Sequence, residues 1–141
     1  MNKKNKLIII LFSLFLMTGL YAYFLLSRSS FINMKEVSPV LKISAAEISE
    51  HYLEDEKKSD SMYKGKVLEI KGIIKKINFL NNRNTLILQG YNTYSNIICD
   101  IQNVNKKEFD KLELGDKINL KGICKGFLKD VIILNCVLVN K

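Results

Sequence analysis

The sequence predicts a mostly β fold, in which a small five-stranded barrel follows an amphipathic helix and an N-terminal apolar helix. From residue 62 onward, apolar and polar residues alternate over five segments, which is the period of half-buried strands. Segments rich in Asn and Gly separate them and are typical of turns. A strand pattern with a central glycine occurs twice, fifty residues apart, at Gly65–Lys75 and Gly115–Lys125. Long strands that bend at a glycine suit a small closed barrel.

Residues 1–30 are predicted to form a membrane anchor. Residues 7–26 are twenty residues long, seventeen of them apolar, and contain no charge. A helix of this length spans about 30 Å, the thickness of a bilayer core. Three lysines before residue 7 favour a single-pass protein with a cytoplasmic N-terminus and an extracytoplasmic remainder. The alternative is a cleaved signal peptide, although its apolar region is usually only about 7–15 residues long.

A tether and a helix are predicted between the anchor and the barrel. Residues 31–43 contain the only proline and show no clear period, so we expect a tether. Ser44 and Glu47 have the spacing of a capping box, which starts an amphipathic helix predicted over residues 44–59. Its apolar stripe is narrow, so this helix should pack on one end of the barrel. The barrel domain, with its leading helix, is therefore predicted over residues 44–141.

The order of the predicted elements indicates the OB fold. Three strands, at residues 66–77, 85–89 and 96–101, precede a short helix, and two strands follow at 117–125 and 131–139. This is the order of the five-stranded OB barrel. Segments in the same order also resemble the tRNA-anti-like family of bacterial OB-fold proteins: Ile43–Glu47, Tyr63–Gly72, Leu114–Lys117, Lys121–Cys124 and Val131–Val137.

The resemblance implies an exported or membrane-anchored OB-fold domain and no particular substrate. Many family members carry a lipid-anchor cysteine, whereas here no cysteine directly follows the apolar run. The family name refers to the shape of an anticodon-binding domain, so it does not identify a ligand. Because fold alone does not fix function, the ligand has to be argued from the residues of the site.

Candidate ligand-binding residues lie in the loops beside strands two and three. OB-fold ligands usually bind across these strands, between the loops that join strands one and two and strands four and five. Loop aromatics can stack on bases, but they also pack as lids on barrel ends. On the outer strand faces, where a nucleic-acid binder would carry aromatic residues, the sequence has Ile87 and Ile98. The candidates are Phe79, Arg83, Tyr91, Tyr94, Phe127 and Lys129.

Four lysines are predicted to form a basic stripe on the outside of the barrel. Strands one and four are neighbours in this fold, and their outward positions carry lysines that would attract phosphates. The alternative is a solvated outer face without a ligand, because lysines also blunt strand edges. The four residues are Lys71, Lys75, Lys121 and Lys125.

The cysteines and the histidine give no sign of catalysis or of a metal site. Cys124 and Cys136 lie on adjacent predicted strands, so a disulfide between them is possible in an oxidising compartment. Alternatively, all three cysteines are small buried thiols. No C-x-x-C pair exists, and His51 is the only histidine. Phosphate-loop and nucleophile motifs are also missing from the sequence. We therefore expect no catalytic residue, no metal and no cofactor.

Together these features predict a non-enzymatic binding module outside the cytoplasm. Its expected ligand is a protein, peptide or glycan of the cell envelope, because an extracytoplasmic location disfavours nucleic acid. The alternative ligand is single-stranded nucleic acid, which would bind to the basic face of the barrel. Residues 62–141 carry a net charge of +7. A third possibility is a purely structural subunit of a larger envelope complex.

Overall fold

The computed structural model describes residues 3–27, 33–80, 83–102 and 106–139. The chain divides into two compact units, residues 1–32 and 33–141. The first unit contains helix α1, Lys3–Ser27. Within the described part of the chain, no helix is long and apolar enough to cross a membrane, so the span predicted at residues 7–26 is not supported.

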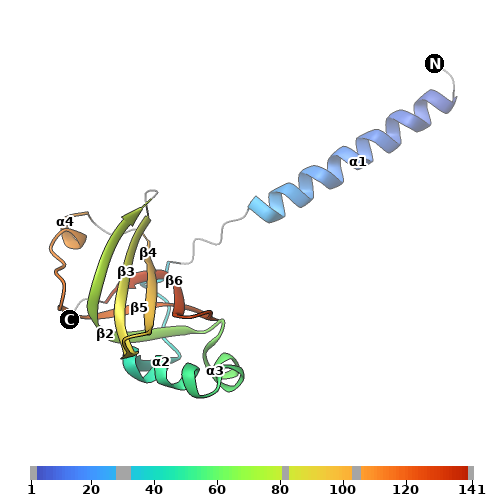
Figure 1. Ribbon diagram of the computed structural model, residues 1–141. Coiled ribbons are helices and arrows are strands. Elements are labelled where there is room, and N and C mark those ends of the chain that lie inside the picture. Colours follow the sequence, from blue (N-terminus) through green and yellow to red (C-terminus); the bar gives the residue numbers. More distant parts are fainter. Residues whose placement is uncertain (1–2, 28–32, 81–82, 103–105, 140–141) are drawn as a thin grey trace. The chain divides into compact units, whose positions relative to one another are not determined.

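The second unit contains a closed five-stranded β barrel (Figure 1). Strand β2 pairs antiparallel with β3 and β5, β3 with β4, and β5 with β6, whereas β4 and β6 run parallel. The short helix α4, Lys106–Phe109, lies between β4 and β5 in the chain. This topology confirms the predicted OB fold. The strands are β2 Val67–Leu80, β3 Arg83–Asn92, β4 Ser95–Ile101, β5 Lys117–Phe127 and β6 Val131–Leu138.

Each of the repeated glycines lies where the barrel wall closely approaches the core. A Cβ atom at Gly72 would be 2.8 Å from Cδ1 of Leu88, and one at Gly122 would be 2.7 Å from Cγ2 of Ile133. Both contacts are shorter than normal van der Waals separations, so each strand needs a glycine at this point. The first half of β2 pairs with β5 and its second half pairs with β3. The repeat predicts this arrangement, in which one long bent strand belongs to both halves of the barrel.

The segment before the barrel is more ordered than a tether. Leu41–Ser44 forms strand β1, which pairs in parallel with β2, and Val40 N donates to Val67 O at 2.8 Å. Met34 is buried, with 3 % of its surface exposed. The prediction of a tether over residues 31–43 is therefore wrong from residue 33 onward. Isolated apolar residues anchor this segment, which is why it shows no period.

Two helices replace the single leading helix predicted over residues 44–59. Helix α2 spans Ala45–Glu54 and α3 spans Glu56–Tyr63. The helix breaks at Asp55, whose backbone is extended (φ −153°) and whose carboxylate accepts from Lys58 N at 2.9 Å as the N-cap of α3. Ser44 caps α2 as predicted, because its hydroxyl accepts from Glu47 N at 3.1 Å.

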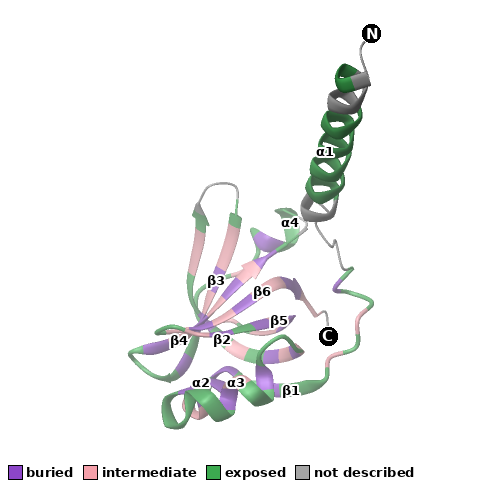
Figure 2. Ribbon diagram, turned by 90° about the vertical axis from the view of Figure 1, so that its right-hand side faces the viewer, coloured by how far each residue is buried: buried purple, intermediate pink, exposed green. Residues whose placement is uncertain are grey.

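Helix α2 closes one end of the barrel, as expected (Figure 2). Its buried apolar side chains, Ala45, Ile48 and Tyr52, belong to the same apolar core as the inward residues of the strands. The charged face of α2 and most of α3 remain exposed. The helix pair is therefore a structural part of the barrel domain.

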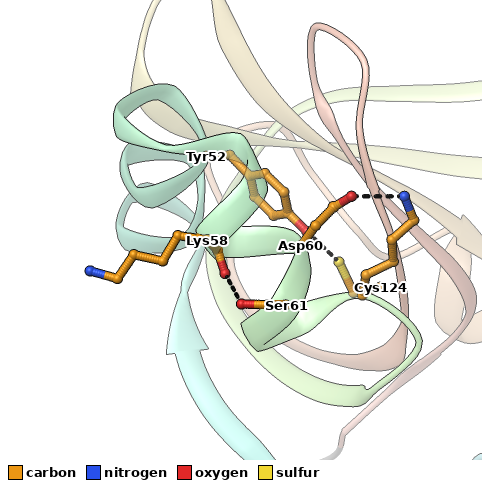
Figure 3. A network of polar contacts seen from close by, with 6 residues as sticks. Tyr52, Lys58, Asp60, Ser61 and Cys124 are labelled. Atoms are coloured by element: carbon orange, nitrogen blue, oxygen red, sulfur yellow. Dashed lines mark hydrogen bonds and ion pairs between the residues drawn. The ribbon is translucent and has the colours of Figure 1, made fainter.

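A polar network fastens the helix pair to β5 (Figure 3). The Tyr52 hydroxyl donates to Asp60 Oδ1 at 3.2 Å and lies 3.5 Å from the Cys124 sulfur. Asp60 also forms an ion pair of 2.8 Å with Lys64. Burial and then the Cys124 thiol raise the pKa of Tyr52, so the phenol stays protonated. The lysine hydrogen bond lowers the pKa of Asp60 below 3.8, and the bond from Tyr52 lowers it further.

This network predicts a pH dependence of stability. Because the pKa of Asp60 is lower in the folded chain than in the unfolded one, ionised Asp60 stabilises the fold above pH 4 and loses this effect as the pH falls through its folded pKa. Urea unfolding of wild type between pH 5 and pH 3 should show a larger loss of stability than unfolding of Asp60→Asn. Equal losses in both proteins would mean that ionisation of Asp60 contributes nothing to the pH dependence of stability.

Candidate ligand-binding face

The candidate site is centred on the side of β3 and β4 that faces away from the barrel core. We call this surface the outer face. Across these strands Thr85 pairs with Asp100, Ile87 with Ile98, and Gln89 with Asn96. Ile98 in turn pairs with Ile132 of β6. The three isoleucines are half-buried and form an apolar row across three strands. Because side chains of a strand alternate between its faces, all these residues point away from the barrel core.

Cations line one side of the outer face. The register of β2 against β3 shifts between Ile74 and Lys76, which is a β-bulge. A bulge adds one residue on one strand, so the consecutive residues Lys75 and Lys76 are both exposed. Lys75 Nζ donates to Asn96 Oδ1 at 2.8 Å, and Arg83 is exposed at the start of β3.

Two tyrosines lie at the opposite end of β3 from Arg83. Tyr91 and Tyr94 are 56 % and 79 % exposed, far more than is usual for side chains of this size. The turn that carries them is held in place, because Asn92 Oδ1 accepts from the backbone N–H groups of Tyr94 and Ser95, each at 2.9 Å. Asp130 accepts from Asn96 N at 2.7 Å and so ties this turn to the β5–β6 turn, where Lys129 is exposed.

Phe79 and Phe127 do not belong to the outer face. Phe79 pairs with Asn84 and lies two residues after Ile77, which packs on the core, so it points to the other side of the hairpin. There it lines a cavity of about 400 Å³ together with Phe109 of α4. Phe127 stacks on Tyr52 with ring centroids 5.5 Å apart and packs as a lid on the barrel end.

The four predicted stripe lysines do not form one stripe. Lys121 is buried, with 8 % of its surface exposed, and its ammonium group donates to Lys35 O at 3.0 Å and Val37 O at 2.7 Å. It holds the segment before β1 on the barrel, so the prediction that it is available to a ligand is wrong. Lys71 and Lys125 are exposed, and Lys75 lies on the outer face.

Cys124 and Cys136 are not paired in a disulfide. Cys99, Cys124 and Cys136 are free thiols and are buried. Cys124 lies next to the Tyr52 hydroxyl, whereas the Cys136 thiol donates to Ile133 O at 3.4 Å. Burial, followed by the Cys99 thiol, raises the pKa of Cys136, so it is a poor nucleophile. Among the described residues, no group of three or more His, Cys, Asp or Glu side chains could hold a metal ion.

Residues 1–138 match a family of known proteins. The chain belongs to the tRNA_anti-like family. Its fold resembles that of a lipoprotein from Klebsiella pneumoniae that has been proposed to bind nucleic acid, with a TM-score of 0.55, 14 % identity, and coverage of 69 % of this chain and 91 % of that one. Entamoeba histolytica asparaginyl-tRNA synthetase gives a TM-score of 0.46 at 10 % identity, over 74 % of this chain and 24 % of the synthetase. No curated protein matches the chain.

Sequence reasoning missed two residues of the outer face in this tRNA_anti-like domain. Lys76 is not among the predicted candidates because strict alternation after Ile74 gives it no outward position, although two adjacent lysines in an apolar strand are a signal for a bulge. Ile132 is not among them either, because β6 is a nearly continuous apolar run, Val131–Val139, with no alternation to assign its faces.

Proposed function

We propose that this chain is a non-enzymatic module that binds single-stranded nucleic acid on its outer face. The observation that carries the proposal is the combination of unshielded cations and exposed aromatic rings on one face. Lys76 faces the middle of β3 from β2 and Arg83 begins β3, whereas Tyr91 and Tyr94 lie toward its other end. Proteins that bind single strands use cations to follow the phosphates and aromatic rings to stack the bases.

The dimensions of the outer face fit an extended strand. Arg83 and Tyr91 are eight residues apart on β3, which corresponds to about 26 Å along a strand. OB folds bind about 4 nucleotides or more along such a length. The three strand pairs described above contain one carboxylate, that of Asp100. Lys76 and Arg83 outnumber it, so the net charge of the described face is positive and attracts phosphates. The half-buried position of Asp100 limits its repulsion of a ligand.

The comparisons support the choice of ligand class. The family name refers to an anticodon-binding shape, and the Klebsiella lipoprotein with the same fold has been proposed to bind nucleic acid. Neither observation identifies a sequence or a distinction between RNA and DNA. We propose a module without catalysis because, in the described strand pairs of the outer face, Asp100 has no second carboxylate, histidine or cysteine beside it with which to form an acid–base pair.

A protein, peptide or glycan of the cell envelope is the second candidate ligand. The apolar row of Ile87, Ile98 and Ile132 favours it, because the centre of the face offers no ring on which a base could stack. A ligand of the envelope requires a barrel that lies outside the cytoplasm. We propose this location, with a single membrane-spanning helix, from the uncharged run at residues 7–26 and the lysines before it. Protease digestion of intact spheroplasts should then degrade the barrel. Protection until lysis would contradict this location.

Fluorescence anisotropy tests the nucleic-acid proposal. The full-length chain in mild detergent is titrated into a labelled mixed-sequence single-stranded oligonucleotide at several salt concentrations. The expected result is binding with a micromolar Kd. The logarithm of the association constant should fall linearly with the logarithm of the salt concentration, with a slope that steepens by about 0.7 for each phosphate contact. The double variant Lys76→Gln/Arg83→Gln should weaken binding about tenfold and reduce the slope by about 1.4.

A matched control keeps this experiment specific. Lys125→Gln removes one exposed charge on β5 and should leave both the affinity and the slope nearly unchanged. The proposal fails if wild type does not bind at any salt, or if Lys125→Gln weakens binding as much as the double variant. In that case the cations are a generic basic surface, and the envelope ligand becomes the better candidate.

A further inference from the structure

Two lysines of like charge lie next to each other on the outside of the β2–β5 pair. Lys71 faces Asn119 and Ile73 faces Lys117 in the register of these strands. Lys71 and Lys117 are therefore diagonal neighbours, with Cα atoms about 7–8 Å apart. Like charges on neighbouring strands repel each other, and the repulsion is strongest when they are directly opposite. An anion bound between the two ammonium groups would remove this repulsion.

Neither lysine has an anionic partner among the described residues. Both side chains are exposed, and no described carboxylate lies within ion-pair distance of them. Other lysines of the same domain do have partners: Lys42 pairs with Glu69 at 3.0 Å, and Lys64 with Asp60 at 2.8 Å. The ammonium groups of Lys71 and Lys117 are thus available to a ligand.

Two clefts meet at this lysine pair, and both lysines line each of them. The first cleft, of about 330 Å³, opens beside β2, where β1 ends and near the end of β3, and Ser44 and Gln89 contribute polar groups. The second, of about 510 Å³, continues toward the loop after α4. Lys111 and Asn119 line it, and Glu108 is the only carboxylate among the described residues that line it. The small residues Ala45, Ala46, Gly72 and Gly90 leave the first cleft room for a ligand.

We propose that Lys71 and Lys117 bind a phosphate group between them. Phosphate offers several acceptor oxygens, and its negative charge, about −2 for a free phosphate and about −1 for a backbone phosphodiester, attracts the two ammonium groups. Gln89 and Asn119 supply further hydrogen-bond donors on either side of the pair. The phosphate belongs either to a small free anion or to the backbone of a strand on the adjoining outer face. The site does not require the proposed nucleic-acid function, because a small anion alone would occupy it.

Isothermal titration of the full-length chain with inorganic pyrophosphate tests the site. At low salt, wild type should bind with a Kd below about 1 mM, and Lys71→Gln/Lys117→Gln should bind at least about tenfold more weakly. Lys125→Gln, which removes an exposed lysine elsewhere on β5, should bind like wild type. The proposal is overturned if wild type shows no saturable binding, or if all three proteins bind equally.

Thermal unfolding separates loss of the site from loss of the fold. Pyrophosphate at a concentration that saturates wild type should raise the unfolding midpoint of wild type by more than that of the double variant, because stabilisation follows the affinity for the anion. Without the anion, the double variant should unfold at the wild-type temperature or above, since like-charge repulsion is removed. Equal stabilisation of both proteins by pyrophosphate would contradict the site.

Competition identifies the source of the phosphate. If pyrophosphate displaces a labelled oligonucleotide from wild type but not from the double variant, the site takes a backbone phosphate of a bound strand. If pyrophosphate binds without displacing the oligonucleotide, or if no oligonucleotide binds at all, the site takes a free anion. Failure of the nucleic-acid proposal therefore remains distinguishable from failure of this site.

Discussion

Replacing Gly90 with alanine should destabilise the barrel by about 3 kcal/mol or more, at the upper end of the usual cost of overpacking. A Cβ atom at this position would collide with the carbonyl oxygen of Ser95 and lie 2.8 Å from the Ser49 hydroxyl. The first contact is with backbone, which cannot rotate away. The β3–β4 ladder is irregular at this point, so a rearrangement would disturb the turn that carries Tyr91 and Tyr94.

The Ser49 hydroxyl makes the effect of Gly90→Ala larger than a simple overlap. Ser49 is fully buried, donates to Ala46 O at 3.1 Å and accepts from Tyr91 N at 2.6 Å. It therefore joins α2 to β3, and a Cβ at residue 90 would push it away from both partners. Urea unfolding measures the effect, with Gln89→Ala at the neighbouring exposed position as the control, expected to change stability by less than about 0.5 kcal/mol. A loss below about 1 kcal/mol for Gly90→Ala would contradict this packing.

Truncating Ile48 to alanine should cost about 2–5 kcal/mol, the usual range for removing a large buried aliphatic side chain. Ile48 is the central apolar residue of α2 and is completely buried in the barrel core. The spread of the range reflects how far the surrounding side chains can collapse into the cavity. The expected outcome is a lower urea midpoint with an unchanged slope.

An exposed residue of the same helix provides the control for Ile48→Ala. Leu53 is 45 % exposed, so Leu53→Ala should change stability by about 0.5 kcal/mol or less. If Ile48→Ala is equally mild, α2 does not close the barrel and the domain begins at β2. If only Ile48→Ala is severe, the helix that precedes the five strands is an obligatory part of this OB domain.

The strand order could be predicted because it depends on strong local signals. Alternating residues such as Leu68 and Ile70 become buried on one face, and the two repeated glycines occupy equivalent close approaches. The break of the leading helix at Asp55 could not be predicted, because in the sequence an aspartate that caps a helix cannot be told from an aspartate on the solvent-exposed face of a continuous helix. The four-residue strand β1 is too short to show a period.

The candidate site was only partly predictable because exposure depends on tertiary contacts. Arg83, Tyr91, Tyr94 and Lys129 are exposed as expected. Alternation alone gave Lys121 an outward direction, but it could not show that residues 35–37 return to cover it. Likewise, an aromatic residue in a turn can project or pack, and only the position of Tyr52 decides that Phe127 packs.

The location of the ligand on the barrel is the central claim, and a chemical-shift titration tests it most directly. The full-length ¹⁵N-labelled chain in mild detergent is titrated with an unlabelled single-stranded oligonucleotide. The account predicts that the backbone amide signals of the outer face, within residues 83–98, shift most and saturate together. Shifts confined to α2 and α3, at the closed end of the barrel, or no saturable shifts at all, would contradict it.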